Sequence, residues 1–318
     1  MKKQVAVIAI GGNSLIKDKN HVSVESQYEA AQETTFHIAD MIESGWDVAI
    51  GHGNGPQVGF IPRRSEIAHK TDGMHEVPLD VCGADSQGAI GYALQQTLQN
   101  ELHRRGIKKP VATLITQVLV DKNDTAFKNP SKPIGGFMGE PEARQKEKDL
   151  GWNVVEDAGR GWRRVVASPI PQEVVELEAV KDLIDAGVIV ITVGGGGIPV
   201  IDKGDHEFIG TAAVIDKDYA SSLLAREINA DLFLISTAVE KVALNFGKPD
   251  QKDIDHMTLS EAKQYLAEGT HFAKGSMAPK MQAIIWYLEA GGRKAIITNP
   301  ENIGRALKGE TGTVIEPD

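Results

Sequence analysis

The sequence predicts an α/β fold: a three-layer αβα sandwich around a mostly parallel, doubly wound sheet, from which a small subdomain protrudes. Short apolar runs rich in β-branched residues recur between longer amphipathic segments along all 318 residues. Several of these runs are apolar throughout, which is typical of strands that helices cover on both faces. A strand–helix alternation that continues over the whole length favours a parallel sheet.

Each expected element follows from its local pattern. Continuous apolar runs indicate strands at residues 4–10, 46–50, 111–120, 188–193, 232–237 and 294–298. Apolar residues at helical spacing predict helices at residues 26–43, 84–105, 172–186, 218–228, 259–267 and 278–290. Thr258 and Glu261 have the spacing of a capping box, and Asn299 before Pro300 is typical of an N-cap followed by proline at the first helical position.

Residues 121–164 interrupt this alternation. The segment is polar and rich in Lys, Asn, Pro and Gly, with one expected helix near residues 140–150 and no strong strand before residues 163–167. Structureless loops of this length are uncommon inside compact domains. We therefore expect a functional lid or a small protruding subdomain, and we favour the subdomain.

The composition excludes several classes of function. The chain has 34 basic and 44 acidic residues, a net charge of −10 and no basic run, whereas nucleic-acid affinity comes from clustered Lys and Arg. The single cysteine, Cys82, excludes an internal disulfide, and a free cysteine is usually a buried small hydrophobe. No apolar stretch approaches the ~20 residues of a membrane span. The apolar run near the N-terminus is shorter than that of a signal peptide. We expect a cytoplasmic protein.

Three glycine clusters follow expected strands, at the place where α/β proteins bind ligands. They are residues 11–13, 51–57 and 194–197. Glycine lets the backbone approach a ligand closely, so that successive N–H groups can point at phosphate oxygens. Each cluster alone is also explained as a tight turn, but three at one sheet edge favour a shared phosphate site. The P-loop motif and the dinucleotide-binding glycine motif are both absent from the sequence.

Phosphate binding in an acidic protein requires local positive charge, and single lysines beside glycine, proline or aspartate can supply it. Lys132, Lys217 and Lys280 lie in such contexts. Phosphoryl transfer needs mainly positioning and charge stabilisation, so lysines and backbone N–H groups can suffice. A solvated surface lysine is the simpler interpretation of each, and Lys217, between Asp216 and Asp218, also fits a structural ion pair.

The sequence resembles the carbamate kinases of the amino acid kinase family. The matching segments run in family order and cover essentially the whole chain: residues 9–14, 52–59, 78–84, 86–88, 129–135, 193–199, 215–218, 245–250 and 275–280. The resemblance implies the amino acid kinase fold. It also implies an acceptor-side lobe, residues 1–200, that contains the insert 121–164, and a nucleotide-binding lobe, residues 201–318.

The resemblance implies a reversible reaction, ATP + carbamate = ADP + carbamoyl phosphate, catalysed by a homodimer and running toward ATP in arginine fermentation or related disposal of carbamoyl phosphate. Carbamate is already an oxyanion, so no general base is required. Mg²⁺ would accompany ATP or ADP, held largely by phosphate oxygens and water, and no side chain is assigned as its ligand. Two alternatives stay open: a kinase of another small carboxylate-like acceptor, and a non-catalytic paralogue that binds nucleotide or carbamoyl phosphate.

The resemblance also implies roles for particular residues. The expected catalytic residues are Lys132, Lys217, Asp218 and Lys280, with Lys132 reaching in from the insert. Phosphate would be bound by Gly11, Gly12, Asn13, Gly195 and Gly196. The carbamate side would be formed by Gly53, Asn54, Gly55 and Gln57. The nucleotide would contact Asp216, Val239, Lys241, Met277 and Pro279.

The chain departs from the family pattern at a few positions. Gly136 and Met138 replace a usual proline and tyrosine, Asp85 stands where methionine is common, and Ala238 and Ala243 replace an aspartate and a tyrosine. The first two changes would loosen the arm that carries Lys132. A carboxylate at position 85 that faced the acceptor pocket would disfavour an anionic acceptor, and the change at position 243 would thin the wall of the nucleotide pocket.

Overall fold

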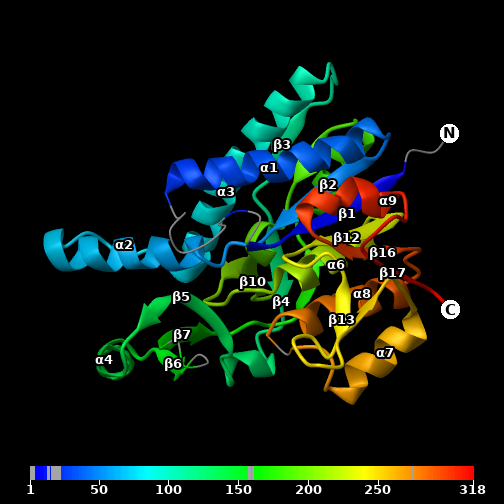
Figure 1. The fold of residues 1–318 in the computed structure, drawn as a ribbon. Coiled ribbons are helices and arrows are strands. Elements are labelled where there is room, and N and C mark those ends of the chain that lie inside the picture. Colours follow the sequence, from blue (N-terminus) through cyan, green and yellow to red (C-terminus); the bar gives the residue numbers. More distant parts are fainter. Residues whose placement is uncertain (1–3, 13–14, 16–22, 157–158, 160, 274) are drawn as a thin grey trace.

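An eight-stranded sheet forms the centre of the computed structural model, which describes residues 4–12, 15, 23–156, 159, 161–273 and 275–318 (Figure 1). Its order is β15-β17-β16-β12-β1-β2-β9-β3, and every neighbouring pair is parallel except β16 and β17. The predicted mostly parallel, doubly wound sheet is confirmed. The strands are β1 (Val5–Ile10), β2 (Asp47–His52), β3 (Val111–Thr113), β9 (Ile189–Ile191), β12 (Leu232–Ser236), β15 (His256–Thr258), β16 (Ala295–Thr298) and β17 (Thr313–Glu316).

Successive residues of β1 point to opposite helical layers, because side chains alternate along a strand. Val7 and Ala9 belong to one apolar cluster, whereas Ala6 and Ile8 belong to another. The first cluster includes residues of α5 (Leu177–Asp185), α6 (Lys217–Glu227), α7 (Leu259–Glu268) and α8 (Met277–Glu289). The second includes residues of α1 (Val24–Glu43), α3 (Leu79–Arg104) and α9 (Ile303–Leu307). Helices therefore cover both faces, and the predicted three-layer sandwich is confirmed.

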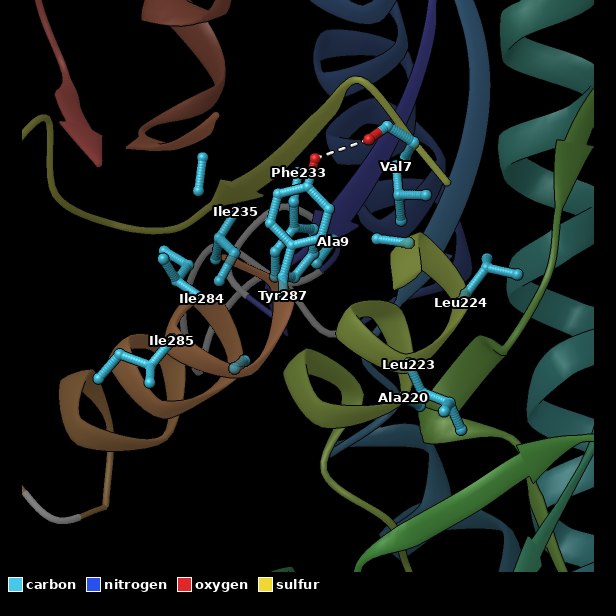
Figure 2. Close-up of a cluster of buried hydrophobic side chains, with 14 of the residues drawn as sticks. Val7, Ala9, Ala220, Leu223, Leu224, Phe233, Ile235, Ile284, Ile285 and Tyr287 are labelled. Carbon is cyan, nitrogen blue, oxygen red and sulfur yellow. Dashed lines mark hydrogen bonds between the residues drawn. The ribbon is translucent and has the colours of Figure 1, made fainter. Parts of the chain in front are cut away.

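Figure 2 shows part of the first cluster. Phe233 and Ile235 of β12 face Ile284 and Tyr287 of α8, and all four side chains are fully buried. The Tyr287 hydroxyl donates a hydrogen bond to the Ala230 carbonyl at 2.7 Å. This satisfies a polar group that would be costly to bury alone.

The apolar run 111–120 is two strands, which makes the prediction of a single strand wrong. β3 ends at Thr113, and β4 (Gln117–Val120) joins a second sheet of order β11-β10-β4-β8. The Gln87 side chain accepts a hydrogen bond from the Thr116 N–H at 2.8 Å and donates one to the Thr116 carbonyl at 3.0 Å. These are backbone groups that would pair with neighbouring strands if residues 111–120 formed one continuous strand. The sequence pattern does not indicate the partner strands β8 (Pro171–Val174), β10 (Ile198–Asp202) and β11 (Phe208–Gly210).

Residues 121–164 form a small antiparallel sheet and one helix. The sheet has the order β5-β7-β6, and in Figure 1 it lies with α4 at the lower left, away from the main sheet and beside α2. The helix expected near 140–150 is confirmed as α4, but β5 is a strand where none is expected. The elements are η2 (Thr125–Phe127), β5 (Lys132–Met138), α4 (Glu140–Leu150), β6 (Asn153–Glu156) and β7 (Trp162–Val166).

Helix α2 (Gln57–Asp72) also falls outside the expected elements. Among its residues only Gln57 and Val58 are buried, so it lacks the apolar stripe by which a helix is predicted from sequence. It also contains a proline, Pro62. The helix expected at 172–186 begins only at Leu177, because the preceding residues pair with β4 as β8.

The expected signals at helix ends are partly realised. The Glu261 N–H donates to Thr258 Oγ1 and the Thr258 N–H donates to the Glu261 carboxylate, which confirms the capping box of α7. Pro300 begins a helical turn, η4 (Pro300–Asn302), but the Asn299 side chain donates to Glu301 at 2.9 Å and does not cap it. Helix α3 begins at Leu79, after an extended Pro78, and not at residue 84.

The remaining strands, β13 (Val242–Leu244) and β14 (Lys252–Ile254), form a separate hairpin. The division into an acceptor-side lobe, residues 1–200, and a nucleotide-binding lobe, residues 201–318, stays a prediction. Among the helices of the described ranges, none has the length and apolar character of a membrane span.

Candidate active site

The carboxyl ends of β1, β2 and β9 lie side by side, because these strands are parallel neighbours in the main sheet. A cavity of about 230 Å³ opens at this edge. Its lining includes Gly12, Gly53, Gly55 and Gly195, so all three glycine clusters contribute. β5 and the N-terminal ends of α6 and α8 complete the wall. Such an edge is the usual ligand site of an open α/β sheet.

Three lysines converge on the cavity and are paired with two aspartates. Lys280 Nζ lies 3.0 Å from Asp218 Oδ2, and Lys217 Nζ contacts the other carboxylate oxygen, Oδ1. Lys132 Nζ, on β5, lies 2.6 Å from Asp216 Oδ2. The three lysine side chains are only 12 to 31% exposed, so they are not solvated surface lysines. Three cations against two carboxylates leave one net positive charge in the cavity.

The pKa values of these groups follow from their burial and their pairing. Burial alone would raise the pKa of Asp218, but the two lysines outweigh it and hold this pKa well below its usual range. For Lys217 burial dominates and lowers the pKa, with Asp218 opposing. For Lys280 the two aspartates outweigh burial, and the pKa is raised. Asp218 is therefore an ionised anchor that holds two ammonium groups beside each other.

The N-terminus of α6 adds a second source of positive potential. Asp216 is its N-cap and accepts a hydrogen bond from the Asp218 N–H at 2.9 Å, while its other oxygen binds Lys132. Lys217 is the first helical residue. Unpaired N–H groups and the helix dipole at such a terminus favour bound phosphate. The same aspartate thus ties the insert to the start of α6.

Two glycines give the neighbouring side chains room to reach the cavity. A Cβ atom on Gly53 would lie 3.1 Å from Lys217 Cδ, which is tighter than an ordinary contact. Gly195 has a φ of +67°, and a Cβ atom there would lie 2.3 Å from Asn54 Nδ2. The glycines are needed for close approach and not only for turning the chain.

Polar side chains behind the cavity hold its loops in place. Asn54 Nδ2 donates to Ser86 Oγ at 2.8 Å, and that hydroxyl donates to the Gly83 carbonyl at 2.7 Å. Gln87 Nε2 donates to the Gly194 carbonyl at 2.9 Å. Ser86 and Gln87 are fully buried in α3. Sequence reasoning assigns no role to either residue; the available signal is their place in the family-like segment 86–88.

His52 is buried beside the second glycine cluster. Burial lowers its pKa to about 4, so the ring is neutral at physiological pH, and its Nδ1 lies 3.0 Å from the Gly53 carbonyl. A Cβ atom on Gly194 would lie 2.4 Å from its Nε2, so the ring packs against the third cluster. His52 positions these loops.

A profile of the amino acid kinase family matches residues 4–299. The chain belongs to the amino acid kinase family. A carbamate kinase of Clostridium perfringens is 52% identical to it, over 97% of this chain and 98% of that protein. A carbamate kinase-like protein of Escherichia coli is 51% identical, over 98% and 99%. The structure of Giardia lamblia carbamate kinase bound to AMP-PNP is 40% identical, covers 100% of this chain and 99% of its own, and has a TM-score of 0.92. The expected family and fold are confirmed.

Within this amino acid kinase fold, the predicted phosphate-binding residues are not equally placed. Gly12 and Gly195 line the cavity. The Gly11 N–H donates to the Ser236 carbonyl and the Gly196 N–H to the Val193 carbonyl, so both are engaged within the backbone. Asn13 lies outside the described residues. The roles of all five residues stay predictions.

Some of the predicted carbamate-side and nucleotide-side residues line the cavity, and others do not. Asn54, Asp216 and Pro279 line the cavity, as do the two glycines beside Asn54. Gln57 is buried but does not line the cavity, and its Nε2 donates to Gln27 Oε1 at 3.0 Å. The remaining three, Val239, Lys241 and Met277, are not part of this wall: Met277 packs against the apolar core, and Lys241 pairs with Asp255 at 2.6 Å.

None of the positions that depart from the family pattern is part of the cavity wall. Asp85 is exposed on α3, so its carboxylate does not face the acceptor space. Gly136 and Met138 line a different cavity beside the insert. Cys82 is buried, and burial raises its pKa to about 11, which supports its interpretation as a structural residue and not a reactive thiol.

Proposed function

We propose that the chain is a carbamate kinase, which transfers a phosphoryl group reversibly between ATP and carbamate and forms ADP and carbamoyl phosphate. One observation carries this proposal. Three lysines meet at a glycine-lined cavity, in a chain that is about half identical to a carbamate kinase over nearly its whole length.

The mechanism that this geometry supports is charge stabilisation without a general base. Carbamate is already an anionic nucleophile, and the buried histidine nearest the cavity is neutral with a pKa of about 4. Lys217 and Lys280, held side by side by Asp218, would contact the phosphate oxygens and spread the charge that develops during transfer. Lys132 would reach the transferring group from the insert after leaving Asp216.

The donor set of the cavity fits magnesium that arrives with the nucleotide. Its carboxylates, Asp216 and Asp218, are each already paired with lysine, and among the described residues no group of three or more His, Cys, Asp or Glu forms a metal-binding cluster. We propose that ATP or ADP brings Mg²⁺ bound mainly by phosphate oxygens and water, with Asp216 as the nearest carboxylate once Lys132 moves away. Mg²⁺ would neutralise phosphate charge.

The nucleotide would lie on the side of α6 and α8, against Asp216 and Pro279. A relative with the same fold is described with bound AMP-PNP, which supports ATP binding here. We further propose a cytoplasmic homodimer that makes ATP from carbamoyl phosphate in arginine breakdown. Val239, Lys241 and Met277 stay candidates for contacts with the base or ribose.

One observation favours a second candidate, a kinase of another small carboxylate-like acceptor. The Escherichia coli protein described only as carbamate kinase-like is nearly as similar to this chain as the carbamate kinase of Clostridium perfringens, at 51% against 52% identity. Overall similarity therefore does not choose between the two acceptors. A non-catalytic paralogue is the third possibility, but the paired lysines Lys217 and Lys280 are more than binding alone requires.

The deciding experiment measures ATP formation by the purified protein from ADP and carbamoyl phosphate with Mg²⁺, against acetyl phosphate as the control donor. We expect rapid ATP formation from carbamoyl phosphate only. Formation from both donors would indicate another or a broader acceptor. Binding of ADP without ATP formation would indicate a paralogue that does not turn over.

A further inference from the structure

A second cavity, of about 200 Å³, lies between the insert and α2. Helix α2 contributes Arg63 and Glu66, α4 contributes Glu142 and Lys146, and β7 contributes Arg164. None of these residues belongs to the proposed active site.

The charges of this cavity do not balance. Lys146 Nζ lies 3.4 Å from Glu66 and 3.7 Å from Glu142, and Arg63 lies 3.8 Å from Glu142. Among the described residues, no carboxylate oxygen lies within 4.0 Å of the Arg164 guanidinium nitrogens, which is the limit for an ion pair. Among the residues that line the cavity, three cations face two carboxylates, and Arg164 is the cation without an ion pair.

Arg164 is held in place by an aromatic ring. Its guanidinium lies 4.5 Å from the centre of the Trp152 ring, and Lys146 Nζ lies 4.3 Å from the same centre. Burial lowers the pKa of Arg164, with Glu66 and the more distant Glu76 opposing, so its charge is partly removed from water. A fixed, partly desolvated guanidinium presents the donor pair that binds a carboxylate in a bidentate way.

The rest of the wall is apolar. Val58, Ile134, Phe137 and Met138 line the cavity. Arg164, the cation without an ion pair, matches a ligand with a single negative charge. Glu66 and Glu142 would repel an anion of higher charge. We propose that this cavity binds a small organic monocarboxylate, with its carboxylate on Arg164 and its apolar body against β5.

An occupant of this cavity would act on the active site through β5. Val58 and Ile134 line both cavities, so they form part of the partition between them. Lys132 lies two residues before Ile134 on the same strand. A ligand that fills the second cavity therefore supports β5 against α2 and fixes the position of Lys132. This regulatory step rests on the proposed function, whereas the binding step does not.

Isothermal titration of the substrate-free protein with benzoate tests the binding step. Benzamide, which has the same ring without the charge, is the control ligand. Arg164→Gln is the test variant and Arg144→Gln its matched control, because Arg144 also stacks on an insert tryptophan, Trp162 at 4.3 Å, but does not line the cavity. We expect benzoate to bind the protein and the Arg144 variant equally, and the Arg164 variant about tenfold more weakly or worse.

Benzamide should bind at least about tenfold more weakly than benzoate. Unchanged benzoate affinity in Arg164→Gln, or no binding to the unsubstituted protein at about 10 mM benzoate, would overturn the site. If Arg164→Gln does not fold, Arg164→Lys keeps the charge without the planar fork and should still weaken binding severalfold.

Hydrogen exchange of β5 tests the coupling without any enzyme assay. We expect benzoate to slow amide exchange at residues 132–138 of the unsubstituted protein and not of Arg164→Gln. Benzoate binding with unchanged exchange in β5 would overturn the coupling. A failure of the carbamoyl phosphate assay would leave both results standing, so the two proposals fail separately.

Discussion

Asp218 is the residue on which the geometry of the site depends. It is buried, and each of its oxygens binds one lysine, so two ammonium groups lie close together in a protein interior. Their mutual repulsion contributes to the lowered pKa of Lys217. Without this anchor the two cations would separate or one would lose a proton. The pair that it maintains suits a ligand with several negative oxygens.

Replacing Lys217 by alanine should abolish most turnover while leaving the fold intact. The lysine is nearly buried at the start of α6 and faces the phosphate space. Loss of one such stabilising group costs about 10²–10³ in kcat. Steady-state ATP formation measures the loss, and circular dichroism checks the fold. Lys263→Ala, which removes a lysine from an ion pair outside the cavity, is the matched control and should keep its rate. Weaker ADP binding at an unchanged kcat would contradict the role of Lys217.

Replacing Asp218 by asparagine should shift the pH dependence of kcat. Lys217 must be charged to stabilise the phosphoryl group, so the rate falls as pH rises through its pKa. Burial already lowers this pKa and Asp218 opposes the effect, so removing the carboxylate lowers it further. The alkaline limb of the kcat profile should therefore move to lower pH. Glu289→Gln, which breaks the ion pair of Lys263, should leave the limb in place; an equal shift in both variants would refute this assignment.

Single residues differ in how readily the sequence identifies them. Lys132, Lys217 and Lys280 lie beside glycine, proline or aspartate, which is an unusual context for a surface lysine, and all three line the cavity. Ser86 and Gln87 lie inside a regular helical pattern, where a polar residue normally faces solvent. Gln87 contacts Thr116 and the third glycine cluster, and Ser86 contacts Asn54 of the second cluster, all of which are distant in the chain. No local signal reports such a contact.

Among the secondary-structure elements, the position of the insert depends on its contact with α2. A Cβ atom on Gly59 would lie 2.2 Å from Gly135 Cα, a distance that only a shift of the backbone can relieve. β5 carries both Gly135 and Lys132, so this contact helps to set how far Lys132 reaches. Sequence alone does not predict it, because α2 has almost no buried face and β5 reads as part of a polar loop.

Gly59→Ala should therefore reduce turnover without unfolding the protein. The added methyl group pushes β5 away from α2 and moves Lys132 from the cavity. We expect kcat to fall by about 10-fold or more, since small misplacements of a catalytic group cost up to about 10²-fold. Gly88→Ala is the matched control, because its Cβ would contact nothing within 4 Å and alanine favours a helix. Thermal melting confirms that both fold, and unchanged kcat in Gly59→Ala would show that the contact does not position Lys132.

The insert should also close on its substrates. Lys132 is paired with Asp216 in the described structure, and reaching a phosphoryl group requires that pair to open. We expect ADP with carbamoyl phosphate to slow tryptic cleavage at Arg144 in α4, which is half exposed. Cleavage at Lys263 in α7 is the internal control, because Lys263 is about equally exposed and lies outside the insert. Equal cleavage at Arg144 with and without ligands would count against a lid.

For the molecule as a whole, sequence reasoning succeeds where an apolar run is long and buried on both sides. The central strands β1, β2 and β12 are buried along nearly their whole length, and they establish the parallel sheet. The strands that the pattern misses are short and partly exposed, such as β11, in which only Phe208 is partly buried. Their pairing is decided by contacts distant in sequence, so the second sheet follows only from the assembled fold.

The assembled chain should be a dimer in solution, with a mass of twice 34.3 kDa. Exposed apolar side chains on α1 and α3 support this: Val24 is 67% and Tyr92 58% exposed, and the Tyr92 ring lies 6.1 Å from that of Tyr28. Burying such a surface against a second copy removes it from water. Light scattering of Tyr92→Glu should give the monomer mass. Phe246→Glu should stay dimeric, because Phe246 is 67% exposed but follows β13, whose residues belong to the other apolar cluster. A monomeric parent protein, or loss of the dimer in both variants, would place the interface elsewhere or exclude it.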